Sequence, residues 1–222
     1  MDETCTCGVA PSGPRRRVVL TGGPGAGKTA ALEVVRAQFC DHVAVLPEAA
    51  SVVFGGGFPR GVSAAVRRAS QRAIFHVQEQ LERWAEDEGT AALTLCDRGL
   101  LDGLAYWPGG PDELFADVGR ARAALLARYD LVIHLRTPGE AQGYNHRNPL
   151  RTEVPAEALR IDARIQEAWE GHPRRLFVES EADFRQKLDR VLAALHDELP
   201  ACCRAHMARG VSCVERAHGA VR

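Results

Sequence analysis

The chain has 222 residues, a length that suits one domain with a sizeable hydrophobic core. Its residues are 45% apolar and 26% charged, and the formal net charge of −1 gives no overall field that would attract nucleic acid or acidic membranes. We see neither a stretch of roughly 18 apolar residues, as a membrane span requires, nor an N-terminal signal run, so we expect a cytoplasmic protein without a nucleic-acid partner or a membrane span.

The first strand pattern leads directly into a glycine-rich turn. Residues 17–21 read as a buried strand, and residues 30–36 read as a helix. Between them, residues 22–29 have the sequence GGPGAGKT, which fits the pattern G-x-x-x-x-G-K-[ST] of phosphate-binding loops. A strand, a glycine loop and a helix start are the setting in which this pattern forms a phosphate site.

The loop supplies the groups that a polyphosphate needs. Glycines let backbone amides approach phosphate oxygens, and the helix start adds partial positive charge. We expect Lys28 to reach the β- and γ-phosphates and the Thr29 hydroxyl to bind Mg²⁺. The only other lysine of the chain is Lys187, so it is improbable that a lysine occupies this position of the pattern by chance. The expected nucleotide-binding residues are Gly22, Gly23, Pro24, Gly25, Ala26, Gly27, Lys28, Thr29 and Ala30.

The second strand pattern, residues 42–46, ends at Glu48. In a kinase that acts on an alcohol, a carboxylate there would accept the hydroxyl proton. It could equally bind a substrate sugar, order a water molecule or have only a structural role. We interpret the following glycine-rich region around residues 55–57 as a loop, and residues 66–84 as a long amphipathic helix with Trp84 on its apolar face.

The third strand pattern, residues 91–96, ends at Asp97 and Arg98. We expect Asp97 to hold Mg²⁺ directly or through water, as an aspartate after a strand does in phosphate-loop enzymes. A turn or helix-capping aspartate is the alternative. Arg98 offers a planar guanidinium to a phosphate or to the substrate, and a structural salt bridge is its alternative. Residues 114–125 then show the pattern of one helix.

The fourth strand pattern, residues 131–135, contains His134, which we interpret as a core histidine. The polar segment 137–155 resembles a lid that closes over a nucleotide. Arg147 and Arg151 are its best candidates for neutralising the transferring phosphoryl group, with Arg136 at the hinge. An exposed loop rich in arginine is the alternative.

A helix at 158–169, a strand at 175–178 and a helix at 184–195 complete the pattern. We therefore predict an α/β fold of three layers, the P-loop NTPase kinase-like type, with about five parallel strands and helices on both faces. Thr21, Gly22, Glu48, Asp97, Arg98 and Arg136 follow strand ends and would surround one cleft. The domain is expected at 15–200 with its lid at 137–155, flanked by tails at 1–14 and 201–222. The tail cysteines are expected to be mostly reduced, untethered thiols, and a metal site that they form with His206 is the alternative.

Three segments, LTGGPGAGKT at 20–29, PEAA at 47–50 and CDRGLLDGLAY at 96–106, resemble AAA-type phosphate-loop domains. This group includes the ribosylnicotinamide-kinase part of the bacterial NAD regulator and the animal protein known for a TRPL translocation defect. Tyr129, Tyr144 and Trp169 continue the resemblance, which covers residues 17–197. It implies a kinase-like fold, ATP or GTP with Mg²⁺ and, in some members, phosphorylation of a nucleoside-like alcohol.

Two functions fit these residues. The first is a Mg²⁺-dependent kinase that transfers the γ-phosphoryl group of ATP to a small nucleoside-like or other alcohol. Its expected catalytic residues are Lys28, Glu48, Asp97, Arg98, Arg147 and Arg151. The alternative is a switch or binding protein that depends on ATP or GTP, hydrolyses it slowly and has a protein or lipid partner. The guanine-recognition motif Asn-Lys-x-Asp is absent from the sequence, which favours ATP over GTP.

Overall fold

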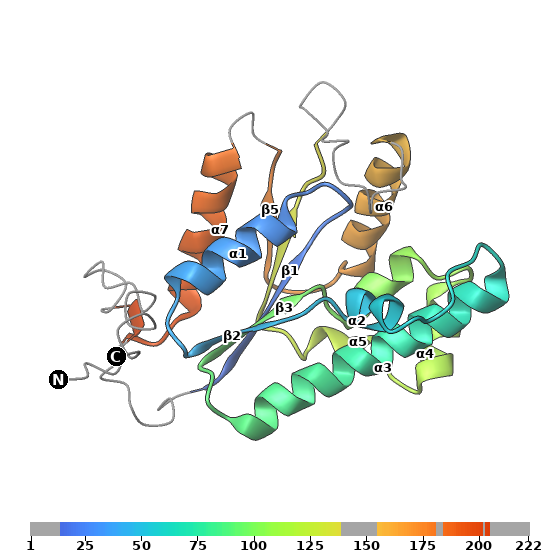
Figure 1. Ribbon diagram of the computed structural model, residues 1–222, viewed down its shortest axis with the longest axis horizontal. Helices are drawn as coiled ribbons and strands as arrows, with labels where there is room; N and C mark the ends of the chain where they lie inside the picture. The colour runs from blue at the N-terminus through green and yellow to red at the C-terminus, as the bar shows by residue number, and fades with distance from the viewer. Residues whose placement is uncertain (1–13, 139–154, 181–183, 202, 205–222) are drawn as a thin grey trace, which may run out of the picture.

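The computed structural model describes residues 14–138, 155–180, 184–201 and 203–204. Within this part of the chain, a sheet of parallel strands forms the centre of the molecule (Figure 1). Its strands in sequence order are β1 (Arg16–Thr21), β2 (Val43–Leu46), β3 (Leu93–Asp97), β4 (Leu131–Leu135) and β5 (Arg175–Val178). They pair in the order β2-β3-β1-β4-β5, which confirms the predicted parallel sheet.

Helices cover both faces of this sheet (Figure 1). They are α1 (Lys28–Gln38), α2 (Ala49–Gly55), α3 (Ala64–Glu88), the 3₁₀ helix η1 (Leu100–Ala105), α4 (Pro111–Val118), α5 (Arg122–Leu126), α6 (Pro155–Ala168) and α7 (Phe184–Glu198). Helices α1 and α7 pack on one face, and the other face is covered by α3, η1, α4, α5 and α6. The predicted three-layer α/β architecture is therefore confirmed.

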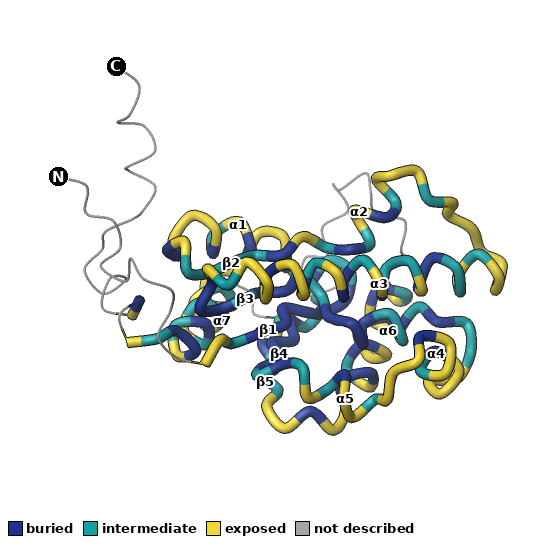
Figure 2. The backbone as a smooth tube through the Cα atoms, turned by 90° about the horizontal axis from the view of Figure 1, so that it is seen from below, coloured by how far each residue is buried: buried dark blue, intermediate teal, exposed yellow. Residues whose placement is uncertain are grey.

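The two cores explain why the strands read as continuous apolar runs. Val18 and Leu20 of β1 point into the core beneath α1 and α7, whereas Val19 between them points into the opposite core. All three residues are fully buried. A strand that is covered on both faces has no side that faces water, so it shows no polar alternation. Figure 2 shows this buried centre as the dark part of the tube around β1 and β4.

Two of the expected elements differ from the structure. The region after Glu48 is not only a loop, because α2 begins directly after that residue. The helix expected at 114–125 is two helices, α4 and α5, which are separated at Gly119. Gly119 has a φ of 63° and caps the end of α4 in the left-handed conformation, a common way for glycine to end a helix.

Helix α3 buries less of its apolar surface than its sequence predicts. Trp84, which we expected in the core, is 56% exposed, whereas Phe75 on the same helix is buried. The helix has 25 residues, but charged side chains occur along its whole length. None of the described helices is both long and apolar enough to cross a membrane.

The packing around Gly99, between β3 and η1, leaves no room for a side chain. A Cβ atom at this position would lie 2.7 Å from Cζ2 of Trp169 and 2.9 Å from Cγ2 of Val19. We expect Gly99→Ala to lower the free energy of unfolding by about 1–3 kcal/mol, the usual cost of overpacking a core. Urea denaturation measures this difference.

Gly55 provides a matched control, because it ends α2 and a Cβ there would meet open space. Gly55→Ala should leave the free energy of unfolding unchanged or raise it slightly, since alanine restricts the unfolded chain. Equal stability of the two variants would contradict the packing described for Gly99.

Candidate active site

The backbone of the glycine loop between β1 and α1 depends on its glycines. Gly22, Gly25 and Gly27 have φ values of 137°, 79° and 95°, which side-chain-bearing residues rarely adopt. A Cβ atom at Gly22 would lie 2.0 Å from the carbonyl oxygen of Leu135 at the end of β4. The sequence pattern therefore forms the compact loop that a phosphate site requires, and the loop is packed against the end of the neighbouring strand.

Lys28 begins α1 and turns its side chain back into the loop. Its Nζ donates hydrogen bonds to the carbonyl oxygens of Gly22, at 2.8 Å, and Gly23, at 3.2 Å. Burial removes water from the ammonium group and, together with the nearby charge of Arg98, lowers the pKa of Lys28 to about 7. An anion that entered the loop would favour the protonated form of this lysine.

Asp162 of α6 binds the backbone of the glycine loop, and the sequence analysis did not identify this residue. Its Oδ1 accepts hydrogen bonds from the backbone N–H of Gly23 at 2.8 Å and from the Thr137 hydroxyl at 3.2 Å, and lies 2.9 Å from Nε2 of His134. Burial alone would raise the pKa of this carboxyl, but the contacts with His134 and Gly23 outweigh it and lower the pKa. One feature of the sequence could have identified it: Asp162 is an acidic residue next to Ile161, on the apolar side of a predicted helix.

His134 is buried on β4, as predicted for a core histidine. Its contact with Asp162 satisfies Nε2, whereas Nδ1 has no hydrogen-bond partner among the described residues. Together the two side chains connect β4, α6 and the glycine loop.

Asp97, at the carboxyl end of β3, lies beside the loop because its partner in the sheet is Leu20 of β1. Its Oδ1 is buried and finds no hydrogen-bond partner in the described part of the chain. Burial raises the pKa of this carboxyl, although the charge of Lys28 opposes the rise. An unpaired buried carboxylate oxygen, with the Thr29 hydroxyl on the same cleft, is the donor set that Mg²⁺ accepts.

Arg98 and Glu48 form an ion pair across the cleft, with 2.8 Å between Nε and Oε1. Glu48 precedes α2, so the helix that sequence reasoning missed fixes its position. Burial would raise the pKa of Glu48, but Arg98 and the Ser51 hydroxyl outweigh it and lower the pKa. Arg98 has a φ of 69°, a rare conformation for a non-glycine residue. Arg98 therefore forms the structural salt bridge that was its alternative role, but both Arg98 and Glu48 also line the cleft.

Asp102 of η1 joins the parts of the site to each other. One carboxylate oxygen accepts hydrogen bonds from the Thr21 hydroxyl and from Arg98, and the other accepts from the Gly99 N–H and from Nε1 of Trp169, each at 3.0 Å. Asp102 is 3% exposed, and Trp169 is also buried. Asp102 therefore connects the strand before the glycine loop to the segment that follows Asp97.

The cleft has a volume of about 700 Å³ and two distinct halves. The first half is formed by residues 24–30 of the glycine loop with Glu33 and Asp97. The second half is formed by side chains of α2, α3 and α4, of the connection between α2 and α3 and of the residue after η1. They include Phe54, Arg60, Gln71, Ile74, Phe75, Gln78, Tyr106 and Leu114. Glu48 and Arg98 also line this cleft.

Several residues expected around the cleft lie elsewhere. Thr21 is fully buried, and Gly22 and Gly23 contribute the packed base of the loop rather than the lining of the cleft. Arg136 forms ion pairs with Asp162 and Glu179 instead of facing the cleft. Arg147 and Arg151 lie outside the described residues.

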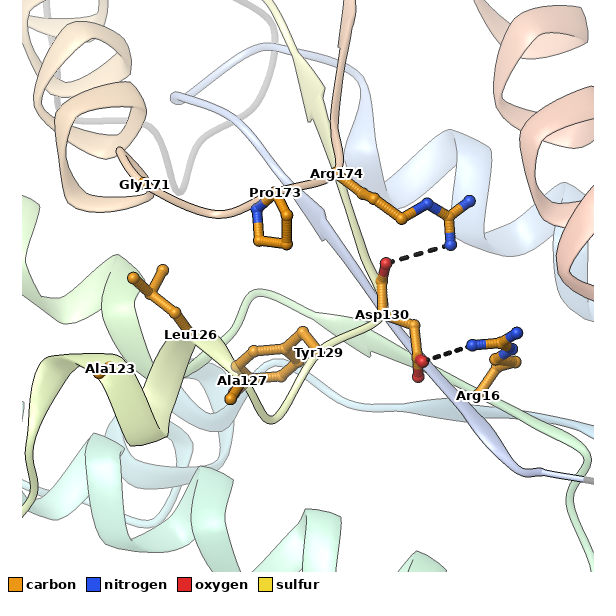
Figure 3. Close-up of a pocket in the computed structure, with 9 residues that line it drawn as sticks. All are labelled: Arg16, Ala123, Leu126, Ala127, Tyr129, Asp130, Gly171, Pro173 and Arg174. Atoms are coloured by element: carbon orange, nitrogen blue, oxygen red, sulfur yellow. Dashed lines mark hydrogen bonds and ion pairs between the residues drawn. The ribbon is translucent and has the colours of Figure 1, made fainter.

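A second cavity, of about 460 Å³, lies at the opposite end of the sheet (Figure 3). Nη1 of Arg16 lies 2.7 Å from Oδ1 of Asp130, and Arg174 contacts the Asp130 backbone oxygen at 3.3 Å and Glu198 at 2.5 Å. Both arginines that line this cavity therefore already have acidic partners.

The pKa of Lys28 predicts how the stability of the ligand-free protein depends on pH. The folded-state value of about 7 lies below the ordinary 10.5, so between these values the unfolded chain binds more protons than the folded chain. The resulting penalty on the folded state is largest below pH 7. The free energy of unfolding should therefore rise above pH 7, by up to about 1.4 kcal/mol per pH unit from this group.

Urea denaturation at pH 7 and pH 8 tests this dependence. Lys28→Met should remove the rise between these pH values. Lys187→Met is the matched control and should retain most of it, because the pKa of Lys187 is lowered only to about 8. Identical profiles for the wild type and Lys28→Met would contradict the burial of a protonated Lys28.

Comparison with known proteins agrees with this architecture. No curated protein matches the chain. A solved structure of thymidylate kinase from Candida albicans is similar, with 12% identity and a TM-score of 0.54 over 84% of this chain and 93% of that one. At this identity the similarity concerns the fold alone. A family model described as an AAA domain matches residues 17–187. The chain therefore belongs to this AAA domain family, and its fold is that of a P-loop kinase-like α/β protein.

Proposed function

We propose that this chain is a Mg²⁺-dependent kinase that transfers the γ-phosphoryl group of ATP to a small alcohol. One observation carries the proposal: the cleft lined by the glycine loop and Asp97 continues to Phe54, Gln71 and Phe75, so it offers surface beyond the loop for an acceptor. A cleft of about 700 Å³ lies within the range of small-molecule sites. A protein that only binds or hydrolyses a nucleotide would not need this additional half.

The first half of the cleft suits the triphosphate. Lys28 would exchange the carbonyl oxygens of Gly22 and Gly23 for phosphate oxygens, and the anion would raise its pKa from about 7. Thr29 and Asp97 would hold Mg²⁺, which neutralises charge on the β- and γ-phosphoryl oxygens when it is bound. The loop amides and the start of α1 add partial positive charge on the same side.

Glu48 would orient the acceptor hydroxyl and take its proton. Its lowered pKa keeps it ionised, so it accepts a hydrogen bond but is a weak base. Phosphoryl transfer depends mainly on positioning and charge stabilisation, so a weak base in a fixed position is sufficient. Arg98 would fix that position through its 2.8 Å ion pair and place positive charge near the transferring group.

The second half of the cleft favours an acceptor with a flat ring, such as a nucleoside. Phe54, Ile74 and Phe75 provide apolar surface, and the Gln71 amide provides a donor and an acceptor at its edge. The guanidinium of Arg60 lies 4.4 Å from the centre of the Phe54 ring at the same end. ATP is the proposed donor, since the sequence lacks the guanine-recognition motif.

A nucleotide-dependent switch with slow hydrolysis and a protein or lipid partner is the second candidate function. Val62, in the connection between α2 and α3, is 86% exposed and Val52 on α2 is 47% exposed. These apolar side chains would suit a macromolecular partner near the cleft.

Two variants and a product assay test the kinase proposal. We expect Lys28→Ala to abolish ATP binding, measured by calorimetry, because it removes the cation within the loop. Glu48→Gln should bind ATP but reduce transfer by about 10²–10⁴-fold, the range for a lost acid–base group. The assay supplies ATP and Mg²⁺ with a panel of nucleosides and other alcohols and detects the phosphorylated product, expected at roughly 1–100 s⁻¹.

Glu33→Gln is the matched control, because Glu33 also lines the cleft but lies on α1, away from the Glu48–Arg98 pair. It should retain transfer. Unchanged turnover in Glu48→Gln would show that the assignment of Glu48 is wrong. Hydrolysis without transfer to any acceptor, stimulated by a partner, would favour the switch instead.

A further inference from the structure

We propose that Cys40, His42 and Cys203 form a binding site for a thiophilic transition-metal ion of the zinc class. The three residues gather where α1 ends, β2 begins and the chain continues beyond α7. This is the end of the sheet opposite the nucleotide cleft, so the site is separate from the proposed kinase chemistry.

The ligand atoms are already close to the positions that a metal ion needs. The Nδ1 atom of His42 lies 3.5 Å from Sγ of Cys203 and 4.0 Å from Sγ of Cys40. All three ligand atoms lie within 4.8 Å of one another. In a tetrahedral zinc site, bond lengths of about 2.3 Å to sulfur and about 2.0 Å to nitrogen place these atoms about 3.6 Å apart. Small side-chain movements would therefore complete the geometry.

The backbone holds these side chains in place without an ion. The carbonyl oxygen of Cys40 accepts the Val43 N–H at 2.9 Å, and that of His42 accepts the N–H groups of Ala92 and Leu93. These bonds fasten the turn between α1 and β2 to the start of β3. On the other side of the cluster, the Cys203 N–H donates to the carbonyl oxygen of Pro200 at 3.0 Å. Cys40 and Cys203, far apart in the sequence, lie in the same hydrophobic core.

The environment favours a soft metal ion over the hard ion proposed for the cleft. Cys40 and Cys203 are 5% and 1% exposed and belong to the core beneath α1 and α7. Thiolate and imidazole ligands select zinc-like ions, whereas Mg²⁺ prefers oxygen ligands. His42 is only half-buried, so water can supply the remaining ligand from that side. The ion would join the segment after α7 to the end of α1.

The test titrates Co²⁺ into reduced, metal-free, full-length protein and follows its absorption spectrum. We expect a thiolate-to-cobalt charge-transfer band and the intense visible bands of tetrahedral Co²⁺, both lost when Zn²⁺ displaces the cobalt. Zinc should also raise the midpoint of thermal unfolding, because it binds the folded state. Cys40→Ser and Cys203→Ser should each lose the charge-transfer intensity of one thiolate and bind Co²⁺ more weakly.

Cys96→Ser is the matched control, because Cys96 is a buried cysteine in the core on the other face of the sheet. It should keep the full cobalt spectrum. Circular dichroism verifies that each variant is folded. If one of the cysteine variants does not fold, the His42→Ala variant is tested in its place. Absence of the charge-transfer band in the wild type, its full persistence in both cluster variants, or its equal loss in Cys96→Ser would overturn the proposal.

Discussion

The close approach of the glycine loop to the end of β4 and to α6 is the constraint on which the site depends. Gly22 lies against the backbone of Leu135, and the N–H of Gly23 is bonded to Asp162. Because these contacts fix the loop, two of its carbonyl oxygens accept hydrogen bonds from the ammonium group of Lys28. Burial and the charge of Arg98 lower the pKa of this group to about 7. The buried cation is costly without an anion, and this cost favours binding of a polyphosphate.

A second set of contacts connects the loop to the acceptor half of the cleft. Asp102 accepts hydrogen bonds from Thr21, at the end of β1, and from Arg98, after β3, while Arg98 holds Glu48 at the start of α2. The strand before the loop and the helix that lines the acceptor half are therefore joined through buried charged groups. Such a network tolerates little displacement, because each unpaired partner would be left in a low-dielectric interior. This rigidity suits a reaction in which positioning does most of the catalysis.

Much of this arrangement follows from local sequence patterns. Apolar runs and helical periodicity were enough for the parallel sheet, and the residues after strand ends included Glu48 and Asp97, which do line the cleft. The sequence pattern did not reveal α2, because a helix of seven residues that ends in a run of glycines is too short to show a clear helical periodicity. Nor did it reveal Asp162 or the exposure of Trp84, since both depend on which helix face meets the sheet. Long-range packing decides such positions, and for Asp162 the local sequence offered only a weak signal, an acidic residue on the apolar side of a predicted helix.

A crystal structure with a non-hydrolysable ATP analogue and Mg²⁺ would show directly whether the glycine loop binds a polyphosphate. We predict that Nζ of Lys28 leaves the carbonyl oxygens of Gly22 and Gly23 for phosphate oxygens, with Asp97 and Thr29 at the metal ion. We also predict that the terminal phosphate points toward Glu48. A nucleotide bound outside the glycine loop, or a Lys28 that still contacts both carbonyl oxygens with the analogue in place, would contradict polyphosphate binding by this loop.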